Sequence, residues 1–389
     1  MQNTDHALKR DNRNGILFMR KEFIPFLLYL FINVLFVDKY AARITEWHAV
    51  LSLLYLCAGT GLFFCLRWVQ KRDWNFKSLL FIGGLLYGVA MLSIQYAIDP
   101  LTIQVDRWSA IHYFLDNMFD GVYPYSAQTH LGGYGSPFPI WQIVHIPFYA
   151  IGNVGLSVFV GLALFLYVIA RYDSNRTAFL ALLLTIASPA INYEIVVRSD
   201  LITNFLCVFA LCAWLRHRSI RIEEHLLGIA VLAGLCAATR LSAVIPIAFL
   251  YGYSFLQLPL RRQFVFILIA VGTWGLVFLP FLLWDSNQLL FFQYNPLLLQ
   301  TRQGSPIVLL LFGAAAIGWT IYIKEHRQHF SLHAGALLTL LVVLTFTYNM
   351  LTSGNYHLFS SAYDITYLNM ALPFYIHDIV AGLSSESVS

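Results

Sequence analysis

Residues 78–98 read SLLFIGGLLYGVAMLSIQYAI, a run of 21 residues without Asp, Glu, Lys or Arg. A helix of about 20 largely apolar residues is long enough to cross the hydrocarbon core of a bilayer. Charged residues mark both ends of the run, because Lys77 precedes it and Asp99 follows it. The stretch therefore predicts a transmembrane helix.

The composition of the whole chain favours the same class. Of its 389 residues, 59% are hydrophobic, 16% are aromatic and only 11% are Asp, Glu, Lys or Arg, and the mean hydropathy is +0.66. Soluble domains carry about 25% charged residues, so an integral membrane protein is expected. The net charge of +4 is small, and we expect no nucleic-acid partner. The five cysteines lie within apolar stretches and indicate neither a disulfide framework nor a zinc site.

Further apolar stretches predict an all-α, polytopic fold with about twelve transmembrane helices. The candidate spans are 23–37, 49–66, 78–98, 140–170, 177–194, 201–215, 226–239, 241–260, 264–284, 306–323, 334–351 and 365–382. The segment 140–170 is too long for one upright helix and has Gly152 and Gly155 in its middle. We expect it to divide into an interfacial piece containing Pro147 and a span near 154–170.

The distribution of basic residues predicts the orientation. With a basic cytoplasmic N-terminus over 1–22, a single membrane domain over 23–383 and a disordered tail over 384–389, 18 of the 24 Lys and Arg residues fall on the cytoplasmic side. Cytoplasmic loops are normally enriched in Lys and Arg. Both termini are therefore expected in the cytoplasm, and the host membrane is expected to be a bacterial inner membrane.

The longest segment outside the candidate spans, 99–139, is rich in aromatic and ionisable residues. Loops of this length are commonly either functional or disordered, and its aromatic residues provide material for packing. Trp108, Ile111, Leu115 and Met118 recur at helical spacing, which predicts an amphipathic helix on the membrane surface over 106–119 with Asp106 at its N-terminus.

This loop carries a resemblance to a known family. An outward Asp opens an amphipathic helix, Gly121-Val122-Tyr123-Pro124-Tyr125 follows, and Ser136-Pro137-Phe138-Pro139 leads into the next span. Over about 98–155 this arrangement resembles the first large loop of GT-C glycosyltransferases, and the nearest members are the bacterial enzymes that use polyprenyl-phosphate mannose. The chain departs from many members in having a lone Asp followed by Arg107 where they have paired acidic residues.

The resemblance implies an inverting membrane glycosyltransferase with a polyprenyl-phosphate sugar as donor and a glycolipid, polysaccharide or protein as acceptor. Asp106 matches the acidic residue expected to act as general base, taking the proton of the acceptor hydroxyl. Arginines at the outer ends of spans suit a leaving phosphate, and these are Arg198, Arg240 and Arg302. The remaining candidates for substrate binding are Arg107, His112, Asp116, Tyr125, Asp200, His357 and Asp364.

Each candidate also has a purely structural interpretation. Asp106 can cap the surface helix, Asp116 and His112 lie one turn apart and can pair, and Arg107 can extend toward lipid headgroups. Arg198 and Asp200 can form a local ion pair at a helix start. Arg240 interrupts an apolar run, where a charge marks either a site or a tight outer turn.

Other functions remain open at this point. No metal ligand set or other cofactor is expected, although a divalent ion is used by some relatives of this fold. The chief alternative is a transporter or flippase of a lipid-linked saccharide, a class that places ionisable residues at mid-membrane on interrupted helices. A scaffold does not account for the long outer loop, and a phosphoethanolamine-type transferase is expected to bring a large soluble domain.

Overall fold

The computed structural model describes the backbone of residues 2–302, 304–324, 329–360 and 362–385, and the side chains of residues 22–384 within these ranges. The described residues form helices and connecting turns, with one isolated bridge between Gln128 and Tyr134 in place of a sheet. The α-helices are α1 (Gln2–Ala41), α2 (His48–Gln70), α3 (Phe76–Ala97), α4 (Arg107–Phe119), α5 (Pro139–Val144), α6 (Ile146–Ala150), α7 (Ser157–Tyr172), α8 (Asn175–Ile186), α9 (Pro189–Val196), α10 (Asp200–His217), α11 (Leu226–Ala237), α12 (Ile245–Gln257), α13 (Leu260–Trp284), α14 (Ser286–Leu290), α15 (Pro296–Thr301), α16 (Pro306–Ile323), α17 (Phe330–Ser353) and α18 (Leu372–Ser385). The 3₁₀ turns are η1 (Pro124–Ser126), η2 (Val154–Leu156), η3 (Leu241–Val244) and η5 (Ile365–Ala371).

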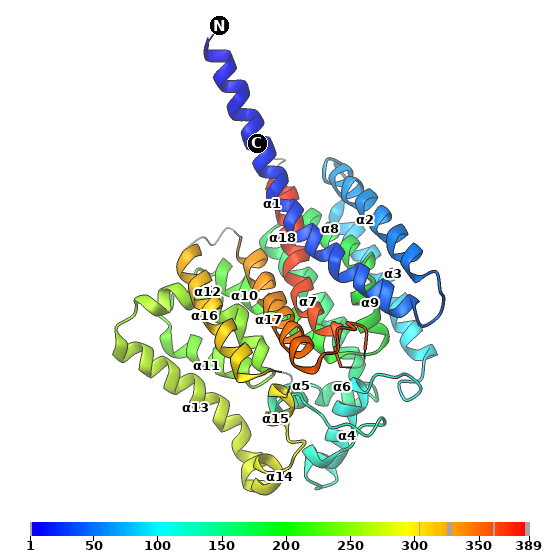
Figure 1. The fold of residues 1–389 in the computed structure, drawn as a ribbon, viewed down its shortest axis with the longest axis vertical. Coiled ribbons are helices and arrows are strands. Elements are labelled where there is room, and N and C mark those ends of the chain that lie inside the picture. The colour runs from blue at the N-terminus through cyan, green and yellow to red at the C-terminus, as the bar shows by residue number, and fades with distance from the viewer. Residues whose placement is uncertain (1, 303, 325–328, 361, 386–389) are drawn as a thin grey trace.

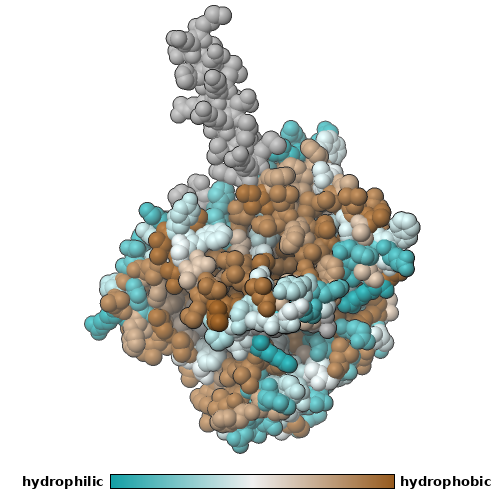
Figure 2. Space-filling model, in the orientation of Figure 1, coloured by the Kyte–Doolittle hydropathy of each residue, from teal (hydrophilic) through white to brown (hydrophobic). Residues whose placement is uncertain are grey.

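Eight described helices are long and apolar enough to cross a membrane, which supports a membrane-embedded protein. These helices are Glu22–Ala41, His48–Gln70, Phe76–Ala97, Val154–Tyr172, Asp200–His217, Leu260–Trp284, Pro306–Ile323 and Phe330–Ser353. The segment 140–170 divides as predicted, with α5 and α6 preceding a span that begins at Val154. Much of the face in Figure 2 is hydrophobic, and Phe81 and Leu310 are more than two-thirds exposed, as expected for lipid-facing side chains.

The remaining predicted spans differ from straight transmembrane helices, and the count of twelve is not confirmed. The segment 177–194 forms α8 and α9, which are bent by 74° at a break between them. Ser188 begins α9 by accepting a hydrogen bond from the backbone N–H of Ile191, and Pro189 follows it; proline cannot continue the preceding helix. The segments 226–239 and 241–260 form the shorter helices α11, η3 and α12, and 365–382 divides into η5 and the first turns of α18.

A large core joins the helices that run between the two ends of the molecule. Its fully buried aromatic residues include Tyr29 and Phe36 of α1, Phe209 of α10, and Phe374 and Tyr375 of α18. Figure 1 shows α18 running beside α1, with the C-terminus near the upper end and α4, α5 and α14 at the opposite, lower end. Ser384 and Ser385 belong to α18, while 386–389 of the predicted tail lie outside the described residues.

A second core fixes the long loop. The predicted amphipathic helix forms as α4, but its apolar face packs against protein: Ile111, Phe114 and Leu115 are buried together with Phe278 and Phe281 of α13. Burying an aromatic side chain contributes a few kcal/mol, so this contact helps to order the loop against α13. The expected packing of the loop aromatics is therefore present, and its partner is α13.

Candidate functional site

Arg107, the first residue of α4, joins three distant parts of the chain. Its Nη1 donates to Ser199 Oγ at 2.7 Å and to Glu194 Oε2 of α9 at 3.4 Å. Its Nη2 donates to Asp364 Oδ2 at 2.9 Å and also to Thr366 Oγ1. The planar guanidinium can serve several acceptors at once because it carries five N–H donors. One cation thus holds two carboxylates at the meeting point of α4, α9 and η5.

The charges of this cluster stabilise one another. Burial works to lower the pKa of Arg107, but the carboxylates of Glu194, Asp364 and Asp200 outweigh it and hold that pKa above its ordinary value. Burial likewise works to raise the pKa of Asp364, yet Arg107 and the hydrogen bonds from Thr366 hold it below its ordinary value. The ion pair of Arg107 with Asp364 is therefore fully charged at neutral pH.

A cavity of about 270 Å³ lies beside Arg107. Three basic and three acidic side chains line it, namely Lys39, Arg43, Arg107, Asp106, Glu194 and Asp364. Lys39 donates from Nζ to the backbone carbonyl of Tyr363 at 3.2 Å, and the Arg43 guanidinium lies 4.8 Å from the ring centre of Tyr40. This concentration of ionisable groups in one cavity is the arrangement expected of a binding or catalytic site.

Asp106 lies at the N-cap position of α4, as predicted, but its carboxylate makes no capping hydrogen bond to the described backbone. Instead, Oδ2 accepts a hydrogen bond of 2.9 Å from Thr129 Oγ1. The turn that contains Thr129 and Gly133 packs closely against this carboxylate, because a Cβ on Gly133 would lie 2.9 Å from Asp106 Oδ2. The capping interpretation therefore does not account for the side chain, which is held by the 129–133 turn at the cavity.

The three predicted phosphate ligands lie elsewhere. Arg198 is buried and donates from Nη2 to the carbonyls of Gln95 and Ile98, the latter at 2.8 Å. Arg240 forms a buried ion pair with Asp200, and Arg302 is exposed at the end of α15. Buried charges must find internal partners, which explains why the first two face protein groups. The predicted local pair of Arg198 with Asp200 is replaced by that of Arg240 with Asp200.

Two further predicted residues form the pair suggested by their spacing. His112 Nε2 and Asp116 Oδ2 are 3.8 Å apart, and Tyr149 donates to Asp116 Oδ1 at 2.7 Å. That hydrogen bond raises the pKa of Tyr149 to about 12, and burial lowers the pKa of His112. The ring of Trp108 stacks on His112 at 4.4 Å between centroids. Neither His112 nor Asp116 lines the Asp106 cavity.

The remaining predictions divide between structural positions and the site. Tyr125 is buried in the second core and donates to the carbonyl of Pro137 at 3.1 Å. Asp200 also accepts a 2.9 Å hydrogen bond from Trp141 Nε1, and His357 is exposed in the loop after α17. Asp364, by contrast, lines the cavity with Asp106 and Arg107. Three predicted residues are thus brought together.

Sequence reasoning missed three ionisable residues of the cavity as site candidates: Lys39, Arg43 and Glu194. Their signal was present, since all three belong to the few charged residues expected on the outer side. Lys39 and Arg43 follow the first predicted span directly. Only the packing of α1 against α9 and η5 shows that they share a cavity with residues far along the chain.

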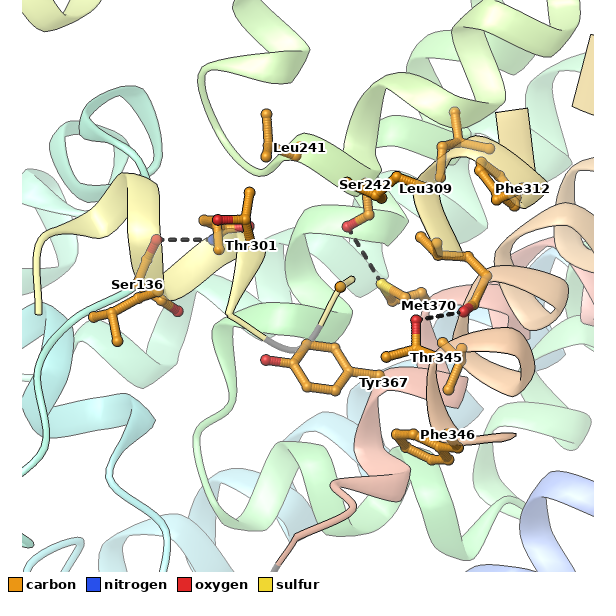
Figure 3. A pocket seen from close by; sticks show the side chains of 16 residues that line it. Ser136, Leu241, Ser242, Thr301, Leu309, Phe312, Thr345, Phe346, Tyr367 and Met370 are labelled. Carbon is orange, nitrogen blue, oxygen red and sulfur yellow. Dashed lines mark hydrogen bonds between the residues drawn. The ribbon is translucent and has the colours of Figure 1, made fainter. Parts of the chain in front are cut away.

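A second, largely apolar cavity of about 260 Å³ adjoins the cluster through η5. Figure 3 shows Tyr367, Met370, Ser242, Leu309 and Phe346 among the side chains around it. Tyr367 also faces the Arg107 cluster, because the Arg107 Cζ atom lies 5.9 Å from its ring centre. Its neighbour Thr366 lines the charged cavity. Consecutive residues of η5 therefore contribute to an apolar space and to a charged one.

Within the residues that the structure describes, no group of three or more His, Cys, Asp or Glu side chains is arranged to hold a metal ion. Comparisons with known proteins leave the interpretation to this geometry: no family model matches the chain, and no curated protein or solved structure shows significant similarity to it.

Proposed function

We propose that this chain is a membrane glycosyltransferase that moves a sugar from a polyprenyl-phosphate donor to a hydroxyl acceptor. The observation that carries the proposal is the cavity in which a carboxylate, Asp106, lies together with the cations Lys39, Arg43 and Arg107. Transfer from a sugar phosphate needs a base for the acceptor and positive charge for the departing phosphate. The cavity offers both.

The cations have different roles in this proposal. Arg107 is engaged by Glu194 and Asp364, so it positions the carboxylates and the walls of the cavity. Lys39 and Arg43 bind the donor phosphate in place of Arg198, Arg240 and Arg302. Lys39 is buried, so solvent screens its charge less than a charge on an open surface, and Arg43 is exposed at the same cavity.

The reaction follows from these positions. Asp106 takes the proton of the acceptor hydroxyl as its oxygen attacks the anomeric carbon. A new carbon–oxygen bond forms to the acceptor while the bond from that carbon to the phosphate oxygen breaks, with inversion. The leaving phosphate keeps the electron pair, and Lys39 and Arg43 stabilise its charge.

The apolar cavity supports the lipid part of the donor. Its lining from Leu241, Leu309, Phe312, Val342 and Phe346 suits a hydrocarbon chain. Tyr367 borders this cavity and also faces Arg107, so a phosphate near the cluster would place the first prenyl units beside η5. We place the reaction on the periplasmic side of a bacterial inner membrane, with both termini in the cytoplasm.

One observation favours the transporter alternative. The 74° bend between α8 and α9 resembles the interrupted helices of transporters, and the buried Glu194 lies in α9 near that bend. The two functions differ in what happens to the donor, since a transporter moves it without breaking the sugar–phosphate bond.

An assay with the purified protein reconstituted in proteoliposomes would distinguish glycosyl transfer from transport. The substrate is polyprenyl phosphate that carries a radiolabelled sugar. A glycosyltransferase releases the label to an acceptor or to water, and the unglycosylated lipid phosphate accumulates. Intact labelled donor that appears in the opposite leaflet without cleavage would contradict the proposal and support the transporter. Protein-free liposomes provide the background for both readouts.

A further inference from the structure

A third cavity, of about 740 Å³, lies at the opposite end of the molecule from α4 and Asp106. The ends of α2 and α18, the turn before α3 and the turn between α7 and α8 form its walls. Figure 1 places the α2–α3 turn toward the end of the molecule where α18 finishes, opposite α4. None of the residues assigned to glycosyl transfer lines this cavity, so an inference from it is independent of that function.

Two cations line the cavity. Lys77 is exposed at the start of α3, and Arg176 is half-buried at the start of α8. Arg176 is held in place, because its Nη2 donates to the carbonyl of Arg72 at 3.1 Å and its Cζ lies 5.0 Å from the ring centre of Phe76. That hydrogen bond uses one of the five N–H donors of the guanidinium. Lys77 and Arg176 together are therefore suited to bind a phosphate group.

Two acceptors line the same cavity. Gln70 is only 6% exposed, and its Oε1 has no hydrogen-bond partner among the described residues. A buried carbonyl without a donor is costly, so it indicates a ligand that donates a hydrogen bond. Asp173 adds a negative charge beside the cavity while its Oδ2 lies 3.3 Å from His377 Nε2. A carboxylate and a carbonyl together favour an ammonium group over an uncharged hydroxyl.

The surroundings place this cavity at a membrane interface. Trp68 and Trp74 are 49% and 42% exposed and pack edge to face, and Arg72 lies over the Trp68 ring at 4.2 Å. Exposed tryptophans and arginines at the ends of spans are typical of the headgroup region. Phe81 and Leu85, one and two turns further along α3 than Lys77, are exposed and offer an apolar surface for acyl chains.

From these contacts we propose that the cavity binds the headgroup of a phospholipid bearing a primary amine, of the phosphatidylethanolamine class. Lys77 and Arg176 bind its phosphate, and Gln70 and Asp173 accept hydrogen bonds from its ammonium group. The acyl chains lie along α3.

Native mass spectrometry of the purified full-length protein would test this with three lipids of identical acyl chains. Phosphatidylethanolamine is expected to bind about fivefold more tightly than phosphatidylcholine, which has the phosphate but no N–H donor. Lys77→Gln and Arg176→Gln should each weaken binding of both lipids about fivefold. Asp173→Asn should reduce phosphatidylethanolamine to the affinity of phosphatidylcholine, and Arg261→Gln, at an exposed position on α13, should change neither.

Three results would overturn the proposal. Equal affinity of the wild type for phosphatidylethanolamine and phosphatidylcholine would show that the amine is not recognised. Unchanged affinity in Lys77→Gln and Arg176→Gln would show that these cations do not bind the phosphate. Tighter binding of phosphatidylglycerol than of phosphatidylethanolamine would show selection for net negative charge instead. Because Lys77 is exposed, its substitution tests the phosphate contact without disturbing a buried contact, and the ratio of the two affinities is measured within each protein.

Discussion

Thr129 Oγ1 donates a hydrogen bond of 2.9 Å to Asp106 Oδ2, which lies 23 positions earlier in the sequence, and the same hydroxyl accepts one of 3.0 Å from the backbone N–H of Gly133. The carboxylate proposed as base is thus oriented by a turn that follows its own helix. Hydrogen bonds to charged groups contribute about 1.5–3 kcal/mol, which is enough to fix one rotamer.

Thr129→Val removes this hydrogen bond and keeps a side chain of similar shape. Because a base must be held within reach of the proton it takes, we expect kcat to fall about tenfold while the KM for the donor changes little. Initial rates of sugar transfer measure this. Thr102→Val, at an exposed position before α4, is the matched control, and equal losses in both variants would remove the role assigned to Thr129.

Gly133→Ala should affect the same carboxylate by contact. The new Cβ would lie 2.9 Å from Asp106 Oδ2 and 3.3 Å from Thr129 Oγ1, which is too close without a shift of the turn. A fall in kcat with unchanged thermal stability is expected, because the turn can move outward. Gly61→Ala, whose Cβ would meet no atom within 4 Å, should retain the activity of the wild type.

The cations proposed to bind the donor phosphate, Lys39 and Arg43, differ from those expected from the sequence, and substitutions distinguish the two assignments. Lys39→Gln and Arg43→Gln should each raise the KM for the lipid-phosphate donor about tenfold, since each removes a charge from the cavity. Arg302→Gln should leave KM unchanged, because Arg302 does not line that cavity. The reverse pattern would restore Arg302 as a phosphate ligand.

The apolar cavity makes a prediction about donor length. Leu309 lines it, while the adjacent Leu310 is 75% exposed on the outside of α16. Leu309→Trp should therefore raise the KM for a long-chain donor and leave a short-chain donor unaffected. Leu310→Trp, with the same change in size, should alter neither value. Equal effects on both donors would contradict a hydrocarbon chain in this cavity.

Arg107 is predicted to matter for stability as well as activity. Its removal leaves the fully buried Glu194 without its cation, and breaking a buried pair costs about 3–5 kcal/mol. Asp364 also loses its partner, but its side chain is 40% exposed, so water compensates for part of that loss. We expect Arg107→Met to lower the unfolding temperature markedly. The triple variant Arg107→Met, Glu194→Gln, Asp364→Asn should regain much of that loss, and a triple variant no more stable than Arg107→Met would argue against charge pairing as the cause.

Acid should weaken the same cluster. Since the folded protein holds the pKa of Asp364 below its ordinary value, this carboxylate stabilises the fold above the unfolded pKa of roughly 4. That contribution is lost as the pH falls through the lowered value. Unfolding temperatures measured from pH 7 to pH 3 should fall less steeply for Asp364→Asn than for the wild type.

Sequence patterns predicted the local features of this fold well. The spans at 78–98 and 264–284, the division of 140–170 and the helix at 106–119 all depend on periodicity and composition, which are local. The bend between α8 and α9 was missed because most of 177–194 is apolar, and average hydropathy does not show where a helix breaks. Ser188 and Pro189 were the available signal.

The site was only partly predictable for a related reason. Asp106, Arg107 and Asp364 stood out as charges on the outer side, but Lys39 and Arg43 needed knowledge of which helix ends meet. Arg240 looked available because it interrupts an apolar run, whereas the fold places it against Asp200, 40 residues earlier. Pairing across such separations is set by helix packing, which no single stretch of sequence encodes.

The measurement that tests the central claim most directly is sugar transfer by Asp106→Asn in proteoliposomes supplied with labelled polyprenyl-phosphate sugar and acceptor. Asp120→Asn, at the exposed end of α4, is the control for loss of one outer carboxylate. We predict that Asp106→Asn lowers kcat by at least about 100-fold with the folded amount unchanged, while Asp120→Asn transfers at the rate of the wild type. Transfer by Asp106→Asn at the wild-type rate would contradict the assignment of Asp106 as the base.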